Sequence, residues 1–228
     1  MSKKILFTNM LDLNFFPPKP AIKEIPSWYI NTPEYVNNKK KIIGDDKTPH
    51  TIKKCMPVFD SISSGYILYT QVDVEIVQKD NIPYYKWPSQ NAIEFHPILQ
   101  APLHPARNEA PYPKWNNPYA ITTPPGYSVL IIQPMHRESV FTIFPGIVDT
   151  DRYSAPISFP FVLNDVKWEG IIEAGTPMAQ VIPIKRESWK NSIGSEKNII
   201  ESNLIRNKIK TMFYNSYKKQ FWSRKEYQ

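Results

Sequence analysis

The sequence has little of what builds a cross-linked or a membrane protein. Only 7 of its 228 residues are glycine, and Cys55 is its one cysteine, so no disulfide can form within the chain. A single cysteine is typical of proteins that stay in a reducing compartment. The longest apolar run in its body, Val129–Ile132, is far too short to span a membrane. The basic N-terminus lacks the apolar core of a signal peptide. We expect a soluble, intracellular protein.

Proline is the residue in excess, at 23 of 228. This is about double the average usage. Many prolines combined with few glycines favour extended segments and rigid turns over helix. The first 60 residues are broken repeatedly by proline, as in Phe16-Pro17-Pro18-Lys19-Pro20. We interpret residues 1–60 as an extended arm that wraps a domain surface and anchors itself through aromatic side chains.

Residues 61–185 carry the period-2 alternation that predicts a mostly β domain. The alternation is most regular over Gly65–Val77, which we interpret as one strand. Residues 127–133 predict a strand buried on both faces, and Pro160 places its own strand at an edge or a bulge. Two further segments close the domain as a pair, Gly146–Asp151 and Gly175–Val181.

Residues 186–228 form a third region, which differs in charge and in periodicity. Residues 185–228 hold 11 Lys and Arg against 4 Asp and Glu, and this excess equals the net charge of +7 of the whole chain. Residues 195–222 contain neither proline nor glycine, and their apolar spacing predicts one basic amphipathic helix. We interpret it as a helix docked on the β domain with a solvated basic face. Binding of nucleic acid or an anionic surface through this tail is the alternative.

No familiar catalytic motif occurs, because the P-loop, the paired G-x-G-x-x-G, the G-x-S-x-G and the H-E-x-x-H patterns are all missing. His96 and His104 each precede a proline within residues 88–120, which we interpret as a long loop. With His136, they are interpreted as structural or surface histidines. The alternative is a metal site made of His96, His104 and a carboxylate such as Glu94.

Five motifs follow one another along residues 60–185. They are Ser64-Gly65-Tyr66, Pro124-Pro125-Gly126-Tyr127, the stretch 134–139, Gly146-Ile147-Val148-Asp149-Thr150-Asp151-Arg152-Tyr153, and the segment 171–180. This succession resembles the β-clip fold of the dUTPase and dCTP-deaminase superfamily. The chain as a whole is similar to a family of tailed-phage and bacterial proteins. The resemblance implies a mainly β, dUTPase-like barrel or sandwich core with a Pro-rich arm and a C-terminal amphipathic helix.

The resemblance also implies roles for individual residues. Asp149 would be the general base that orients water towards the α-phosphate of a nucleotide. Arg137 and Mg²⁺ would hold the phosphates, and Tyr153 would pack against the deoxyribose. The other candidate binding residues are His96, His104, His136, Asp151 and Arg152. Because the superfamily tends to trimerise, a homo-oligomer in the host cytoplasm or the virion is expected.

Several positions depart from the superfamily pattern. Ile67 replaces the aspartate of the first strand, and Glu138 places a carboxylate where phosphate would lie. Arg152 is inserted before Tyr153, and the glycine-rich C-terminal arm is absent. We therefore expect a non-catalytic binding or assembly module of phage type. The alternative is a divergent nucleotide pyrophosphatase or deaminase-like hydrolase that uses Asp149 and, in that case, Mg²⁺.

Overall fold

The computed structural model describes residues 3–11, 13–36, 50–88, 92–97, 99, 111–211 and 216–228. The chain folds as two compact units. The β unit contains the described residues up to Glu24, residues 64–186 and Tyr227, and the helical unit contains residues 25–63, 187–226 and Gln228. Within the described ranges, no helix has the length and apolar character needed to cross a membrane.

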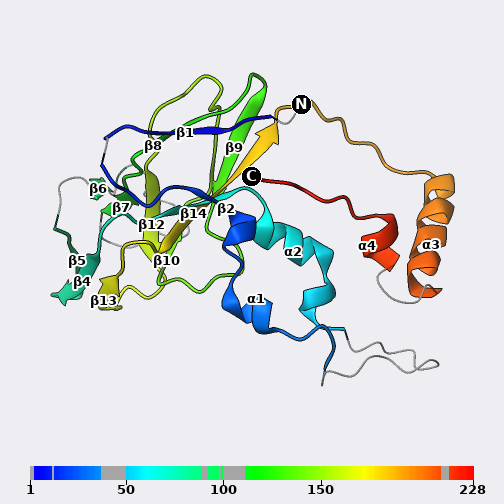
Figure 1. Cartoon of the computed structure of the whole chain (residues 1–228), viewed down its shortest axis with the longest axis horizontal. Helices are drawn as coiled ribbons and strands as arrows, with labels where there is room; N and C mark the ends of the chain where they lie inside the picture. Colours follow the sequence, from blue (N-terminus) through cyan, green and yellow to red (C-terminus); the bar gives the residue numbers. More distant parts are fainter. Residues whose placement is uncertain are drawn as a thin grey trace. The chain divides into compact units, whose positions relative to one another are not determined.

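The β unit consists of antiparallel strands, which confirms the prediction of a mainly β fold (Figure 1). The strands are β1 Leu6–Asn9, β2 Lys19–Pro20, β3 Tyr66–Tyr69, β4 Val74–Lys79, β5 Ile82–Lys86, β6 Ile93–His96, β7 Tyr112–Trp115, β8 Tyr119–Thr122, β9 Tyr127–Ile132, β10 Phe141–Ile143, β11 Gly146–Val148, β12 Phe159–Leu163, β13 Gly170–Ile172 and β14 Pro177–Lys185.

The central sheet has the strand order β11-β9-β14-β3-β2. The two segments that were expected to close the domain as a pair contain β11 and the start of β14. They lie on either side of β9 and pair with it rather than with each other. β9 thus has neighbours on both edges. Its adjacent residues Ser128 and Val129, which lie on opposite faces, are both buried, as expected for this strand, whereas Leu130 and Ile132 are half-buried.

Two strand predictions were wrong in detail. The single strand expected over residues 65–77 is two strands, β3 and β4, which belong to different sheets. The chain bends at Val72 between them, and the hydroxyl of Thr70 donates to the C=O of Glu173 at 2.8 Å. For Pro160 we expected an edge or a bulge, and the edge is excluded, because β12 lies between β10 and β7. Pro160 is tolerated there because it sits where the pairing changes, opposite Lys114 of β7, while the C=O of Pro160 accepts from Phe144.

The stretch 88–120 is also more regular than the expected loop, since β6 and β7 lie in it and β8 begins in it. Its proline-punctuated pattern hid these short strands. Trp115 of β7 stacks on Phe161 of β12 with ring centroids 4.7 Å apart. These rings belong to one apolar core to which the larger sheets all contribute, while Ile67 and Tyr69 pack with Ala21 on the other face of β3.

The described part of the N-terminal 60 residues is extended at first and then helical. Residues 6–20 run through β1, which pairs with β8, and β2, which pairs with β3 (Figure 1). The helical unit then contains α1 Ser27–Asn31, the 3₁₀ turn η3 Ile52–Lys54 and α2 Met56–Ser63. Pro26 directly precedes α1 and so does not break it, because a helix start has no use for the missing N–H.

The tail contributes two further helices to the helical unit, α3 Glu196–Thr211 and α4 Ser216–Gln220. Residues 212–215 between them lie outside the described part of the chain, so the single helix that was predicted is seen as these two pieces. After α4, Trp222 donates its indole N–H to both carboxylate oxygens of Asp60 at 3.0 Å. Lys225 Nζ lies 2.6 Å from the same carboxylate.

Candidate functional site

Arg186 fixes the end of β14 to the start of β9. The two strands are antiparallel with Lys185 opposite Tyr127, so Arg186 lies beside the turn that leads into β9. Its backbone N–H donates to the C=O of Gly126 at 2.9 Å. Its Nη1 donates to the C=O of Tyr127 and to the hydroxyl of Ser128, each at 3.0 Å.

Two aspartates of the turn after β11 complete the arrangement. Both terminal nitrogens of the Arg186 guanidinium bind Asp151. Nη1 donates to Oδ1 at 2.8 Å, and Nη2 donates to Oδ2. Asp151 Oδ2 also accepts the backbone N–H of Gly126 at 2.8 Å. Asp149 Oδ1 accepts the hydroxyl of Ser128 at 2.6 Å and lies 3.2 Å from Arg186 Nη1. We call Arg186 and the residues that contact it here the Arg186 cluster, namely Gly126, Tyr127, Ser128, Asp149 and Asp151.

The backbone of the turn sets which side chains face inwards. The C=O of Asp149 accepts the N–H groups of Arg152 at 2.9 Å and Tyr153 at 2.8 Å. Thr150 is buried, and its hydroxyl shares a hydrogen bond with that of Thr123 at 2.8 Å. The same turn leaves the side chains of Arg152 and Tyr153 exposed. Asp149 and Asp151 therefore both lie beside Arg186, whereas Arg152 and Tyr153 face solvent.

The charges of the Arg186 cluster compensate one another within the protein. The hydrogen bonds from Arg186 lower the pKa of Asp151 to about 2, and those from Asp151 raise the pKa of Arg186. The Asp151 side chain is 6% exposed and that of Asp149 is 51% exposed. Both Nη atoms of Arg186 are thus engaged in one bidentate pair with Asp151.

Arg137 belongs to a different set of contacts. It follows the far end of β9 and donates to the C=O of Glu24. Burial lowers the pKa of Arg137, while the charge of Glu24 opposes that change. β9 has six residues, so its two ends are about 17 Å apart at the usual rise of an antiparallel strand. The structure thus holds Asp149 and Arg137 through separate contacts at opposite ends of one strand.

The loop that carries Arg137 also carries His136. His136 is exposed and has a φ of +57°, in the left-handed region. The preceding residue, Met135, donates its backbone N–H to Oε1 of Gln180 at 3.0 Å. The loop is therefore tied to β14 through Gln180, and His136 stands at its exposed turn.

His96 lies on β6, and His104 falls outside the described residues. Near His96, Glu94 pairs with Lys114 at 2.7 Å. Hydrogen bonds from Lys114 and Asn116 lower the pKa of Glu94, and His96 adds a smaller effect of the same sign. Over the residues that are described, no three His, Cys, Asp or Glu side chains come together as metal ligands. Glu94 is thus engaged by a lysine.

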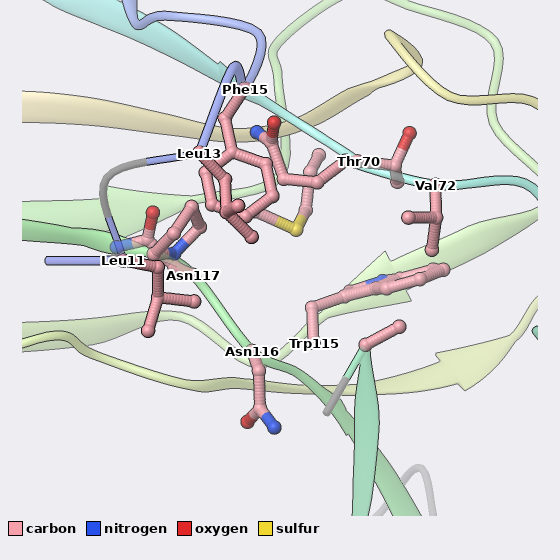
Figure 2. A pocket seen from close by; sticks show the side chains of 12 residues that line it. Leu11, Leu13, Phe15, Thr70, Val72, Trp115, Asn116 and Asn117 are labelled. Atoms are coloured by element: carbon pink, nitrogen blue, oxygen red, sulfur yellow. The ribbon is translucent and has the colours of Figure 1, made fainter. Parts of the chain in front are cut away.

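A pocket in the β unit was not anticipated from the sequence. It has a volume of about 170 Å³ and lies under the segment that follows β1 (Figure 2). Leu11, Leu13 and Phe15 of that segment line it, opposite Trp115 of β7. Its remaining lining residues are Thr70, Gln71, Val72, Ala92, Asn116, Asn117, Pro118 and Met178.

Sequence reasoning also missed Arg186, the residue on which both aspartates converge. No local motif marks it, since its partners lie 35 to 60 positions earlier in the chain. A usable signal would have been the register of β14 against β9, which places the residue after Lys185 next to the Pro124-Pro125-Gly126 turn.

Comparison with known proteins gives structural neighbours alone. One is a mutant dUTPase from phage phi11 of S. aureus, described with a structural Mg(II) ion; it is 12% identical, the match covers 58% of this chain and 84% of that chain, and the TM-score is 0.34. Another is a mutant dUTPase of Staphylococcus bacteriophage 80alpha with dUpNHpp; it is 12% identical, with coverage of 81% and 90% and a TM-score of 0.33. No family model and no curated protein matches the sequence.

Proposed function

We propose that this chain is a non-catalytic binding or assembly module built on a dUTPase-like β fold. The observation that carries the proposal is the Arg186 cluster. Asp149, the residue that the motif resemblance casts as general base, accepts a hydrogen bond from Ser128 at 2.6 Å and pairs with Arg186 on the same oxygen. A general base must have a lone pair directed at the water it activates. Here Oδ1 is directed at protein groups that hold a turn, so Oδ1 does not serve as the base and only Oδ2 would face a water.

Two other positions support the proposal. Ile67, which replaces the aspartate of the first strand, is completely buried with Ala21 and Tyr69, so its surroundings suit an apolar side chain. Glu138 is exposed in the loop where the resemblance places phosphate. A carboxylate there repels a triphosphate. Both positions are consistent with a scaffold that no longer binds phosphate, because Ile67 is a packed apolar residue and Glu138 is an exposed negative charge.

The test is turnover of deoxynucleoside triphosphates. We expect the full-length chain with Mg²⁺ to release neither pyrophosphate nor ammonia from dUTP or dCTP above the buffer rate, followed by ³¹P NMR and by ammonia detection. The decisive variants are Asp149→Ala and Asp165→Ala, because Asp165 is an aspartate of a different turn, where it accepts the N–H of Lys167. Turnover that Asp149→Ala abolishes and Asp165→Ala preserves would overturn the proposal.

The second candidate is a divergent nucleotide hydrolase. The observation in its favour is that the Asp149 side chain is 51% exposed beside a cation, so one face of the carboxylate is open to solvent. With two carboxylates already bound to Arg186, any Mg²⁺ there would be held largely by substrate phosphate and water, which is a common way for Mg²⁺ to bind. The turnover assay separates the two candidates.

A further inference from the structure

A second hollow of the β unit is a groove with a volume of about 480 Å³, lined by the chain that enters β10 and by β13. Its apolar lining residues are Val140, Phe141, Trp168, Ile171 and Ile172. Four of them belong to the core of the unit or pack against it, whereas Ile171 is 60% exposed. The volume falls within the range of about 300–1,000 Å³ that is usual for sites of small molecules.

The aromatic wall of this groove is held in place by the chain around it. The Trp168 ring lies against Gly170, where a side-chain carbon would come within 2.9 Å of the ring, so the ring occupies the space that a side chain would take. The backbone N–H of Trp168 donates to the C=O of Asp165 at 3.0 Å, and its C=O accepts the side-chain amide of Gln78 at 3.3 Å. The groove therefore exists before any ligand arrives.

The neutral polar side chains of the groove are engaged by the protein. The hydroxyl of Ser139 donates to the C=O of Phe141 at 2.7 Å and accepts the N–H of the same residue at 3.2 Å. The hydroxyl of Thr176 donates to the C=O of Glu173 at 2.7 Å. Both hydroxyls thus hold the backbone of the groove, and recognition of a ligand falls to the other lining residues.

Two carboxylates of the groove have no partner of opposite charge. Glu138 and Glu173 both line it, and both are exposed. Within the described residues, neither side chain has an ion pair or a hydrogen bond, and no Lys, Arg or His lines the groove. The adjacent cations Arg137 and Lys167 lie outside the lining, and Arg137 donates to the C=O of Glu24. The groove thus combines an apolar surface with negative charge that the protein does not compensate there.

We propose that this groove binds a small aliphatic amine, whose ammonium group lies beside Glu138 and Glu173. Its hydrocarbon body packs on Ile171 and Trp168, because burial of apolar surface is favourable and indole rings attract cations as well. Phosphates and other anions are excluded, because the two carboxylates repel them. The inference goes beyond the proposed function, since the groove contains no residue of the Arg186 cluster and binding there does not depend on whether that cluster is catalytic.

The test uses three probes of the same chain length at pH 7, n-hexylamine, 1-hexanol and hexanoate. The first is a cation, as the lysine side chain is, the second is neutral and the third is an anion. Binding to the full-length chain is followed in ¹H–¹⁵N spectra through the indole N–H signal of Trp168, which Trp168→Phe assigns. We expect n-hexylamine to shift this signal saturably and to bind about fivefold more tightly than 1-hexanol, on the scale of partly exposed charge pairs, and hexanoate not to bind.

Variants of exposed residues locate the site without disturbing the core. Glu138→Gln and Glu173→Gln keep the side-chain size, and each is expected to weaken n-hexylamine binding about two- to fivefold and to leave 1-hexanol binding unchanged. Glu201→Gln, an exposed carboxylate of α3 outside the groove, makes the same change in net charge and should leave both affinities unchanged. Equal affinity for n-hexylamine and 1-hexanol, n-hexylamine binding that both groove variants leave intact, or the lack of saturable binding would overturn the proposal.

A further probe separates a free amine from a lysine side chain of a partner protein. Nα-acetyl-lysine methylamide carries the same ammonium group on an aliphatic stem, together with two amides that apolar walls leave unpaired. We expect it to bind more weakly than n-hexylamine. Tighter binding of the lysine derivative would assign the groove to a basic peptide and would overturn the assignment to a small amine.

Discussion

The two ends of the β9–β14 pair are held by polar contacts of opposite character. At the Tyr127 end, the Arg186 cluster uses full charges, and the guanidinium and Asp149 remain partly open to solvent. At the Ile132 end, the neutral amide of Gln180 is 1% exposed. It donates to the C=O of Ser64 at 2.7 Å and accepts the N–H of Met135 at 3.0 Å.

The two ends of the strand pair are therefore stabilised by interactions that respond differently to substitution and to solvent conditions. A buried neutral hydrogen bond contributes modestly when made, but leaves a costly unmet group when one partner is removed. Partly exposed charges interact through water, so salt and pH weaken them. The Gln180 end should therefore respond strongly to substitution and weakly to solvent conditions, and the Arg186 end should do the reverse.

The largest effect is expected for Gln180→Leu. The change leaves the part-buried C=O of Ser64 and N–H of Met135 without their partner, and two such groups cost about 2 kcal/mol of the free energy of unfolding. Urea denaturation followed by circular dichroism measures the loss. Gln133→Leu is the matched control, because Gln133 accepts one buried N–H, from Ile143 at 3.0 Å. A loss for Gln180→Leu no greater than that of the control would contradict the comparison.

The next effect is expected for Arg186→Met. It leaves Asp149 and Asp151 close together without their cation, while methionine keeps much of the apolar stem. We expect the melting temperature to fall by several degrees at low salt, and the difference from the unsubstituted chain to shrink at 1 M salt. Lys185→Met, at the adjacent position, should have little effect. A difference that is independent of salt would show that Arg186 acts through packing rather than charge.

Lowering the pH tests the contribution of the Arg186 cluster to stability without changing the size of a side chain. The pKa of Asp151 is depressed from 3.8 to about 2 in the folded chain. A depressed carboxyl pKa stabilises the fold above the unfolded value and loses that contribution as the pH falls through the folded value. The melting temperature should thus drop more steeply between pH 4 and pH 2 in the unsubstituted chain than in Asp151→Asn. Parallel curves would show that Asp151 contributes no acid sensitivity.

The parts of the fold that the sequence revealed are those with local periodicity. The apolar run of β9 and the segments that form β11 and β14 could be recognised from neighbouring residues. β6, β7 and β8 could not, because they are four residues each, β7 contains Pro113, and further prolines lie in the segments between them. The edge position expected for Pro160 was wrong for a similar reason, because whether a strand accepts a proline depends on which strand lies opposite it.

The candidate site divides along the same line. Asp149 and Asp151 share one short motif, so sequence alone placed them together. Arg186 reaches them only through the register of β14 against β9, and Trp115 meets Leu13 and Phe15 only because β1 pairs with β8. Contacts made by strand pairing across the chain leave no local pattern, and these are the contacts that define both the Arg186 cluster and the pocket.

The smallest effect is expected for Asp149→Asn. The amide keeps an oxygen that can accept the hydroxyl of Ser128, and the side chain is half exposed, so the free energy of unfolding should change by about 0.5 kcal/mol or less. Asp151→Asn is the matched change on the buried carboxylate and should cost clearly more, because the bidentate pair with Arg186 is lost. Thermal melts of the two variants at pH 7 decide the order. A cost for Asp149→Asn as large as that for Asp151→Asn would mean that Asp149 carries structural weight equal to that of its buried neighbour, and the difference between the two carboxylates would disappear.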